Sequence, residues 1–91
     1  MSAPEVTAWE DGKLQGALYL FADKNDELPL HTHVAETNHI TVVIRGAITA
    51  FGLDWEENAT SGNILSFTAG VPHRIVATED DTLILNILKG A

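Results

Sequence analysis

Four histidines, in a chain of 91 residues that lacks cysteine, are the side chains whose types and spacing could do chemistry. His31 and His33 are two positions apart, so both point to the same side if this segment is an extended strand. His39 opens a β-branched run that continues to Ile44, and His73 follows a separate loop. Because neutral imidazole is the commonest metal ligand in proteins, this pattern predicts one mononuclear metal site.

The length, charge and composition of the chain limit the classes of protein to which it can belong. A chain of 91 residues is expected to form a single domain over residues 1–91 with one small core. The formal net charge of −8 disfavours binding to nucleic acid or to anionic lipid, because phosphate binding needs clustered Lys and Arg. No apolar run approaches the roughly 20 residues that span a bilayer, and residues 1–6 lack the features of a secretory signal. We therefore expect a cytoplasmic protein with neither a nucleic-acid nor a membrane partner.

Short apolar segments separated by turn residues follow one another along the sequence. We expect roughly seven to nine strands, which include residues 14–22, 39–44, 47–51, 53–57, 63–67, 73–78 and 82–89. The last two segments are expected to form a hairpin around the acidic residues 79–81, and 58–62 is expected to be a turn. Residues 1–12 show only a turn signal, with Val6 and Trp9 as possible anchors. Since no window of about ten residues has a helical apolar stripe, the sequence predicts an all-β protein, an antiparallel barrel or sandwich.

Two of the predicted strands, at 39–44 and 82–89, are apolar on both faces. If His39 and Thr41 face the interior, then Ile40, Val42 and Ile44 face outward. A small monomer rarely exposes that much contiguous apolar surface. We therefore expect a homodimer that pairs through one of these two strands.

The first histidine segment, residues 31–46, resembles the first motif of the cupin superfamily of small metal-binding β-barrels. That motif reads H-x-H, three or four residues, Glu, six residues, Gly. This sequence has His31 and His33 at the paired histidines and Gly46 at the closing glycine. Six residues separate His39 from that glycine, so His39 stands where the family usually has its glutamate ligand.

The second segment, residues 62–77, is similar to the second cupin motif, which reads G, five residues, P-x-G, two residues, H, three residues, N. Gly62 and His73 occupy its first glycine and its histidine. Thr68 replaces the proline, and Ala77 stands at the asparagine position, which is not a metal ligand. The two motifs lie in the family's order, so the resemblance implies a small antiparallel jelly-roll barrel, the double-stranded β-helix.

The resemblance also implies a ligand set, position by position. One divalent transition metal would be held by His31, His33, His39 and His73, and the alternative fourth ligand is Glu36, whose spacing fits neither half of the motif. Imidazole-rich sites suit Fe, Mn, Ni, Cu and Zn, so the ligand type alone does not choose the metal.

Similar single-domain cupins include metal-dependent dioxygenases, isomerases and lyases, so the resemblance implies chemistry on a small oxygenated or anionic molecule. Four neutral imidazoles would leave the metal its full +2 charge, which favours anionic oxygen ligands. Tyr19 and Glu36 are the candidate acid–base residues, although Tyr19 is more simply a core residue with its hydroxyl at the rim. The alternative is a non-catalytic cupin that binds a small ligand or is stabilised by its metal.

Overall fold

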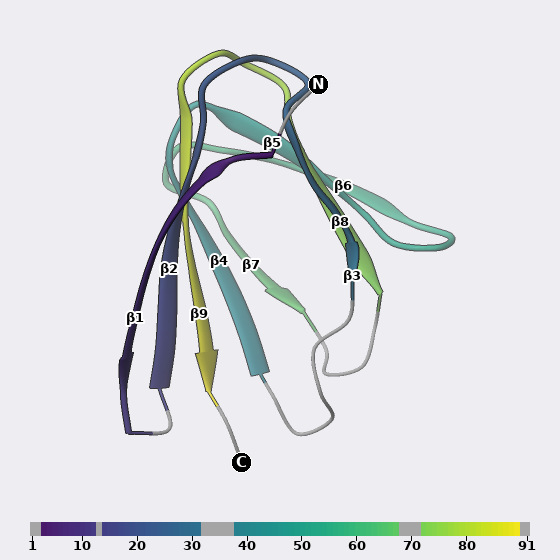
Figure 1. Ribbon diagram of the computed structural model, residues 1–91. Helices are drawn as coiled ribbons and strands as arrows, with labels where there is room; N and C mark the ends of the chain where they lie inside the picture. The colour runs from purple at the N-terminus through teal and green to yellow at the C-terminus, as the bar shows by residue number, and fades with distance from the viewer. Residues whose placement is uncertain (1–2, 13, 32–37, 68–71, 90–91) are drawn as a thin grey trace.

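The computed structural model describes residues 3–12, 14–31, 38–67 and 72–89, apart from the side chains at 29–31, 38 and 89. The strands in these ranges form two antiparallel sheets that face each other (Figure 1). The five-stranded sheet has the order β1 (Glu5–Asp11), β2 (Leu14–Phe21), β9 (Thr82–Lys89), β4 (Asn38–Arg45) and β7 (Ile64–Phe67). The four-stranded sheet has the order β3 (Glu27–His31), β8 (His73–Ala77), β5 (Ala47–Phe51) and β6 (Glu56–Thr60). None of the described ranges contains a helix long and apolar enough to cross a membrane.

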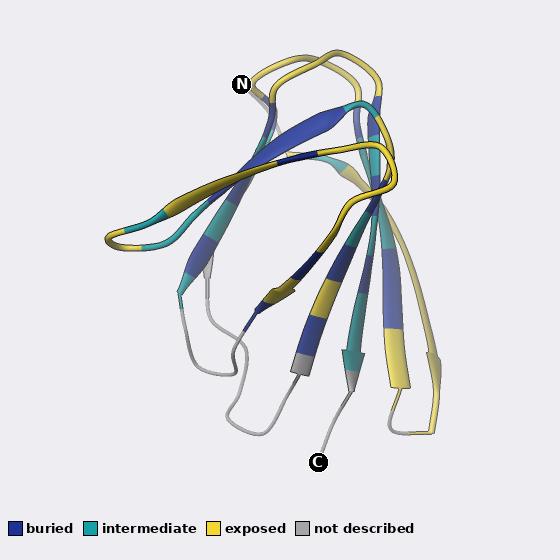
Figure 2. Ribbon diagram, turned by 180° about the vertical axis from the view of Figure 1, so that it is seen from behind, coloured by how far each residue is buried: buried dark blue, intermediate teal, exposed yellow. Residues whose placement is uncertain are grey.

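The core lies between the inner faces of the two sheets. Both sheets contribute to it, with Phe21, Val43 and Ile84 from one and Ile48 and Ile75 from the other. Buried positions alternate with exposed or partly buried ones along β4, β7, β8 and β9, whereas the first four residues of β5 are all buried (Figure 2). In β4, His39, Thr41 and Val43 are buried while Ile40 and Ile44 are exposed, which confirms the predicted facing of this strand.

The predicted hairpin between residues 73–78 and 82–89 is wrong. β8 pairs with β3 and β5, whereas β9 pairs with β2 and β4, so residues 79–81 carry the chain from one sheet to the other. Asp81, with φ of 55°, donates its backbone N–H to the carbonyl of Ala22, and this bond directs the crossing. The error arose because alternation in a sequence shows which face a strand buries but not which strand it pairs with.

The chain crosses between the sheets in the same way at Gly46, between β4 and β5. Gly46 has φ of +83°, a conformation that L side chains rarely adopt. An added Cβ there would overlap the Thr82 side chain. Thr82 donates its hydroxyl to the carbonyl of Glu79, so the two crossings are packed against each other.

The predicted strand at 53–57 and the predicted turn at 58–62 are displaced in the structure. The tight turn comes earlier, where the Gly52 N–H donates to the Trp55 carbonyl, and β6 continues to Thr60. Asn58, which the sequence predicts to be a turn residue, accepts a 2.6 Å hydrogen bond from the Thr49 hydroxyl of β5. A cross-strand partner therefore overrides the turn preference of the asparagine.

The sequence does not predict β1. All of its side chains are exposed, so the strand lacks the alternation of apolar and polar residues that marks a half-buried strand. It pairs with β2 along its full length, from Glu5 opposite Leu20 to Asp11 opposite Leu14. Trp9 covers Gly16 of β2 so closely that an added Cβ on the glycine would overlap the indole ring. Trp9 thus serves as the predicted anchor, from within an edge strand.

Candidate metal centre

The structure brings two of the predicted ligands together between the sheets. His39 projects from β4 and His73 opens β8, and their side chains are 2% and 0% exposed. The two ring centroids are 5.0 Å apart, with an interplanar angle of 46°. Residues 34 positions apart in sequence thus place two imidazoles side by side in the core, one from each sheet.

This separation fits two imidazoles bound to one metal ion. A histidine nitrogen binds a first-row metal at about 2.0–2.1 Å, which places the ring centroid roughly 3.2 Å from the metal. Two rings at adjacent coordination positions, roughly 90–110° apart, then have centroids about 4.5–5.2 Å from each other. The observed centroid distance of 5.0 Å lies inside that range. The donor set, two neutral nitrogens, is also one that first-row metals accept.

The other predicted ligands are only partly placed. His31 ends β3, and its backbone stands directly opposite His73 in the register of β3 and β8. β3 is an edge strand with a register shift between Leu28 and His31, which is where Pro29 lies, and proline is tolerated at such an edge. The His31 side chain, His33 and Glu36 lie outside the described residues, which themselves contain no group of three or more potential ligands. The four-histidine set therefore stays a prediction.

A buried polar chain runs from His39 across two strands. The Thr41 hydroxyl donates to Asn86 Oδ1 at 2.6 Å and lies 3.1 Å from His39 Nε2. A hydroxyl has one proton, and this one is given to Asn86, so the contact with His39 requires the ring to donate its Nε2–H to Thr41. The neutral imidazole then has its lone pair on Nδ1. Nδ1 is therefore the nitrogen through which this tautomer of His39 would bind a metal.

Phe67 holds both imidazoles in place. Its ring stacks on His73 with a centroid distance of 4.3 Å and an interplanar angle of 20°, and it lies 4.9 Å from the His39 ring. Phe67 stands opposite His39 in the register of β7 and β4, and its ring centroid lies 6.2 Å from that of Trp55. The histidine pair is thus packed against a buried aromatic wall.

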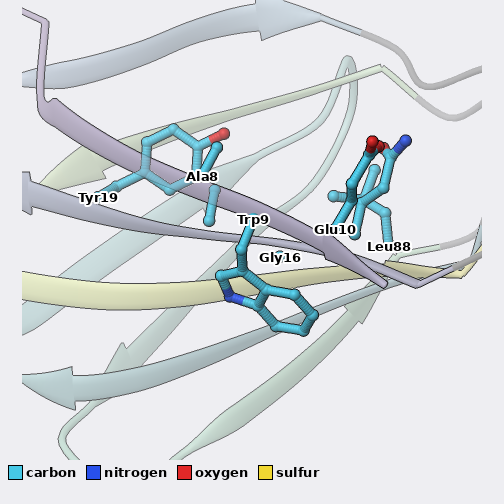
Figure 3. Close-up of a pocket in the computed structure, with 8 residues that line it drawn as sticks. Ala8, Trp9, Glu10, Gly16, Tyr19 and Leu88 are labelled. Carbon is cyan, nitrogen blue, oxygen red and sulfur yellow. The ribbon is translucent and has the colours of Figure 1, made fainter. Parts of the chain in front are cut away.

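A cavity of about 490 Å³ opens on the inner face where β1, β2 and β9 run together. The residues of its lining that share this face are Ala8, Glu10, Gln15, Ala17, Tyr19 and Leu88. Figure 3 shows Tyr19 and Glu10 on one side of the strands and the Trp9 ring on the other. Leu88 stands directly opposite His39 in the register of β9 and β4. The cavity therefore ends one strand away from the histidine pair.

Solved structures share this arrangement of two sheets. An RmlC-like cupin protein from Desulfovibrio desulfuricans has a TM-score of 0.80 at 24% identity, over 93% of this chain and 82% of that one. A double-stranded β-helix domain protein from Klebsiella pneumoniae has a TM-score of 0.84 at 16% identity, over 96% of this chain and 76% of that one. The chain has the cupin fold. The resemblance read from the two histidine motifs is thereby confirmed for the fold.

KdgF from a Halomonas species is also similar to this chain, with a TM-score of 0.81 at 18% identity over 96% of this chain and 76% of that one. The sequence matches no protein-family model and no curated protein sequence. At these identities the likeness concerns the fold of the chain and not its reaction.

Sequence reasoning missed Thr41 and Asn86 as part of the site. A signal for them exists, because each is a lone polar residue inside an apolar strand segment. A buried hydroxyl or amide in such a segment needs a hydrogen-bond partner. Here Thr41 donates to Asn86, which lies 45 positions later in the sequence. Tyr19, the predicted acid–base residue, lines the cavity and packs against the core, and its catalytic role stays a prediction.

Proposed function

We propose that this cupin binds one divalent transition metal between its sheets and uses it to hold a small oxygenated ligand. The ligands are His31, His33, His39 and His73, with Glu36 as the alternative fourth. The observation that carries the proposal is the buried 5.0 Å contact between His39 and His73, which come from opposite sheets and fit adjacent positions on one metal ion. A metal bound there would supply a Lewis acid to an oxygen ligand.

The protein's own side chains have distinct tasks in this proposal. Thr41 and Asn86 fix the tautomer and the orientation of His39 through their hydrogen bonds. Phe67 excludes water from the side of the histidine pair that it covers. Gln15 and Tyr19 offer hydrogen-bonding groups in the neighbouring cavity, where Glu10 adds a carboxylate. That carboxylate favours a ligand whose far end has neutral hydroxyl or carbonyl groups, since a second anionic group would be repelled.

The reaction classes implied by the resemblance are those of a dioxygenase, an isomerase or a lyase, in a cytoplasmic protein. The competing possibility is a metal that only stabilises the barrel. Structural sites are closed, whereas catalytic and ligand-binding sites keep a coordination position open. The cavity of about 490 Å³ one strand away from His39 favours an open site, because a purely structural metal needs no adjoining space.

Visible spectroscopy of the Co²⁺-loaded protein tests this proposal. We expect the weak absorption of five- or six-coordinate Co²⁺, and we expect it to shift when oxalate, a bidentate oxygen chelator, is added. Metal content measured after dialysis checks that oxalate binds the site and does not strip it. An intense four-coordinate spectrum that oxalate leaves unchanged would indicate a closed structural site. Failure of the protein to bind Co²⁺ would contradict the proposal of a metal centre.

A further inference from the structure

One row of side chains crosses the inner face of the five-stranded sheet from edge to edge. Directly opposed residues share a face of a sheet, and the registers of β1, β2, β9, β4 and β7 place one residue of each strand opposite the next. We call these five residues the inner row: Glu10, Gln15, Leu88, His39 and Phe67. His39 and Phe67 are buried beside His73, so one end of the row lies at the histidine pair.

Burial decreases along the inner row toward the β1 edge. His39 is 2% exposed, Leu88 is partly buried, and the side chains of Gln15 and Glu10 are exposed. Leu88, Gln15 and Glu10 all line the cavity of about 490 Å³ (Figure 3). The cavity therefore leads from the strand next to His39 to solvent at the β1 edge.

The spacing of the strands sets the distances along the inner row. Neighbouring strands are about 4.8 Å apart and side chains stand roughly perpendicular to the sheet, so Gln15 is about 10 Å and Glu10 about 14 Å from His39. A metal–oxygen bond of about 2.1 Å and a hydrogen bond of about 2.9 Å leave roughly 9 Å for a ligand that reaches Glu10. Since each carbon–carbon bond of about 1.5 Å advances an extended chain by about 1.3 Å, such a ligand has about six carbons and an oxygen at each end.

The chemistry of the inner row changes along its length. Leu88 has no hydrogen-bonding group in its side chain, so it can contact only the carbon atoms of a ligand. Gln15 can both donate and accept hydrogen bonds, whereas the Glu10 carboxylate only accepts them. A hydroxyl group can donate to Glu10 and a carbonyl group cannot. The far end of the cavity therefore favours a hydroxyl among the neutral oxygen groups.

We propose that Glu10 is a specificity-determining residue that selects a straight-chain hydroxy acid of about six carbons. The acid end binds at the metal centre, the carbon chain passes Leu88 and Gln15, and the terminal hydroxyl donates to Glu10. This inference rests on the function proposed above, to which it adds the length of the ligand and the group at its far end. A dicarboxylic acid of the same length is disfavoured, because Glu10 repels a second carboxylate.

Isothermal titration calorimetry of the Co²⁺-loaded protein tests this selection with hexanohydroxamic acid, 6-hydroxyhexanohydroxamic acid and adipic monohydroxamic acid. The three probes share one chelating head and end in a methyl, a hydroxyl and a carboxylate group. We expect the hydroxyl-ended probe to bind about 5- to 10-fold more tightly than the methyl-ended probe, the gain from one hydrogen bond at an exposed residue. The carboxylate-ended probe should bind most weakly. Metal content measured after the titration checks that no probe strips the metal.

Glu10→Gln removes the charge and keeps the size of the side chain. It should bind the carboxylate-ended probe about 5- to 10-fold more tightly than the wild type does and leave the affinity for the methyl-ended probe unchanged. The matched control is Glu5→Gln, which removes the same charge from the same strand. Glu5 is five positions from Glu10, so its side chain lies on the outer face of β1, and this variant should bind all three probes as the wild type does.

Circular dichroism checks that both variants keep their β structure. Equal affinity of the wild type for the hydroxyl-ended and methyl-ended probes would overturn the role of Glu10 and leave the metal centre in place. So would an equal gain for the carboxylate-ended probe in Glu10→Gln and Glu5→Gln, since the change in net charge alone would then explain it. Failure of all three probes to bind the Co²⁺-loaded protein would contradict the open metal site, and this inference with it.

Discussion

Thr41→Val is expected to weaken metal binding by about 10- to 100-fold, the usual effect of removing a hydrogen-bond partner of a metal-binding histidine. Valine keeps the shape of the buried side chain but has no hydroxyl to accept the His39 Nε2–H. The ring then loses the contact that fixes its tautomer and orientation. The measurement is a competition titration against a chromophoric chelator. Nitrogen chemical shifts of the metal-free protein should report the Nε2–H tautomer of His39 in the wild type and its loss in the variant.

The chain offers a matched control for this change in Thr49→Val. Thr49 is also buried, and its hydroxyl also donates to an asparagine Oδ1 at 2.6 Å, on Asn58. This second Thr–Asn bond lies in the four-stranded sheet, between β5 and β6. Thr49→Val should therefore reduce stability but leave metal affinity unchanged. If both variants lose affinity equally, or neither does, the Thr41 hydroxyl does not position His39.

Phe67→Ala is expected to lower the free energy of unfolding by about 3–5 kcal/mol, the range for removing a large aromatic side chain from a core. Phe67 is 7% exposed and touches both imidazoles and Trp55. Its loss leaves a cavity against the histidine pair and frees both rings to turn. Urea unfolding of the metal-free protein measures the loss in stability.

Phe51→Ala is the control for this loss, because Phe51 is only half-buried and its ring contacts the Arg74 guanidinium near the surface. We expect a clearly smaller loss of stability there. Added metal should stabilise the wild type and the Phe51 variant alike, since a ligand that binds only the folded state raises its stability. It should stabilise the Phe67 variant less. A loss of stability at Phe67 no greater than that at Phe51 would contradict the packing described for the site.

Much of the fold follows from the local pattern of apolar and polar residues. The errors arise where a strand's position depends on which other strand it contacts. The facing of β4 was predictable because His39, Thr41 and Val43 alternate with apolar residues that must lie on the other side of a strand. The strand partners of β8 and β9 were not predictable. Proximity in sequence suggests that the two strands form a hairpin, and only the packed core shows that they belong to different sheets. β6 extends past its predicted end because Asn58 gains a partner in β5.

The candidate site divides in the same way. His39 and His73 could be selected from their type and spacing, and the structure places both in the core in contact. The hydrogen bond between Thr41 and Asn86 could not be predicted, since it depends on the register of β4 and β9. The cavity beside Leu88 likewise forms from three strands whose order the sequence does not specify.

Elemental analysis of the purified protein, with no metal added, tests the metal centre most directly. The wild type should hold close to one transition-metal ion per chain, Glu36→Ala should retain it, and His39→Ala should lose most of it. Full metal content in His39→Ala together with loss in Glu36→Ala would replace the four-histidine site with three histidines and a glutamate. The absence of metal from the wild type and both variants would contradict the metal centre altogether.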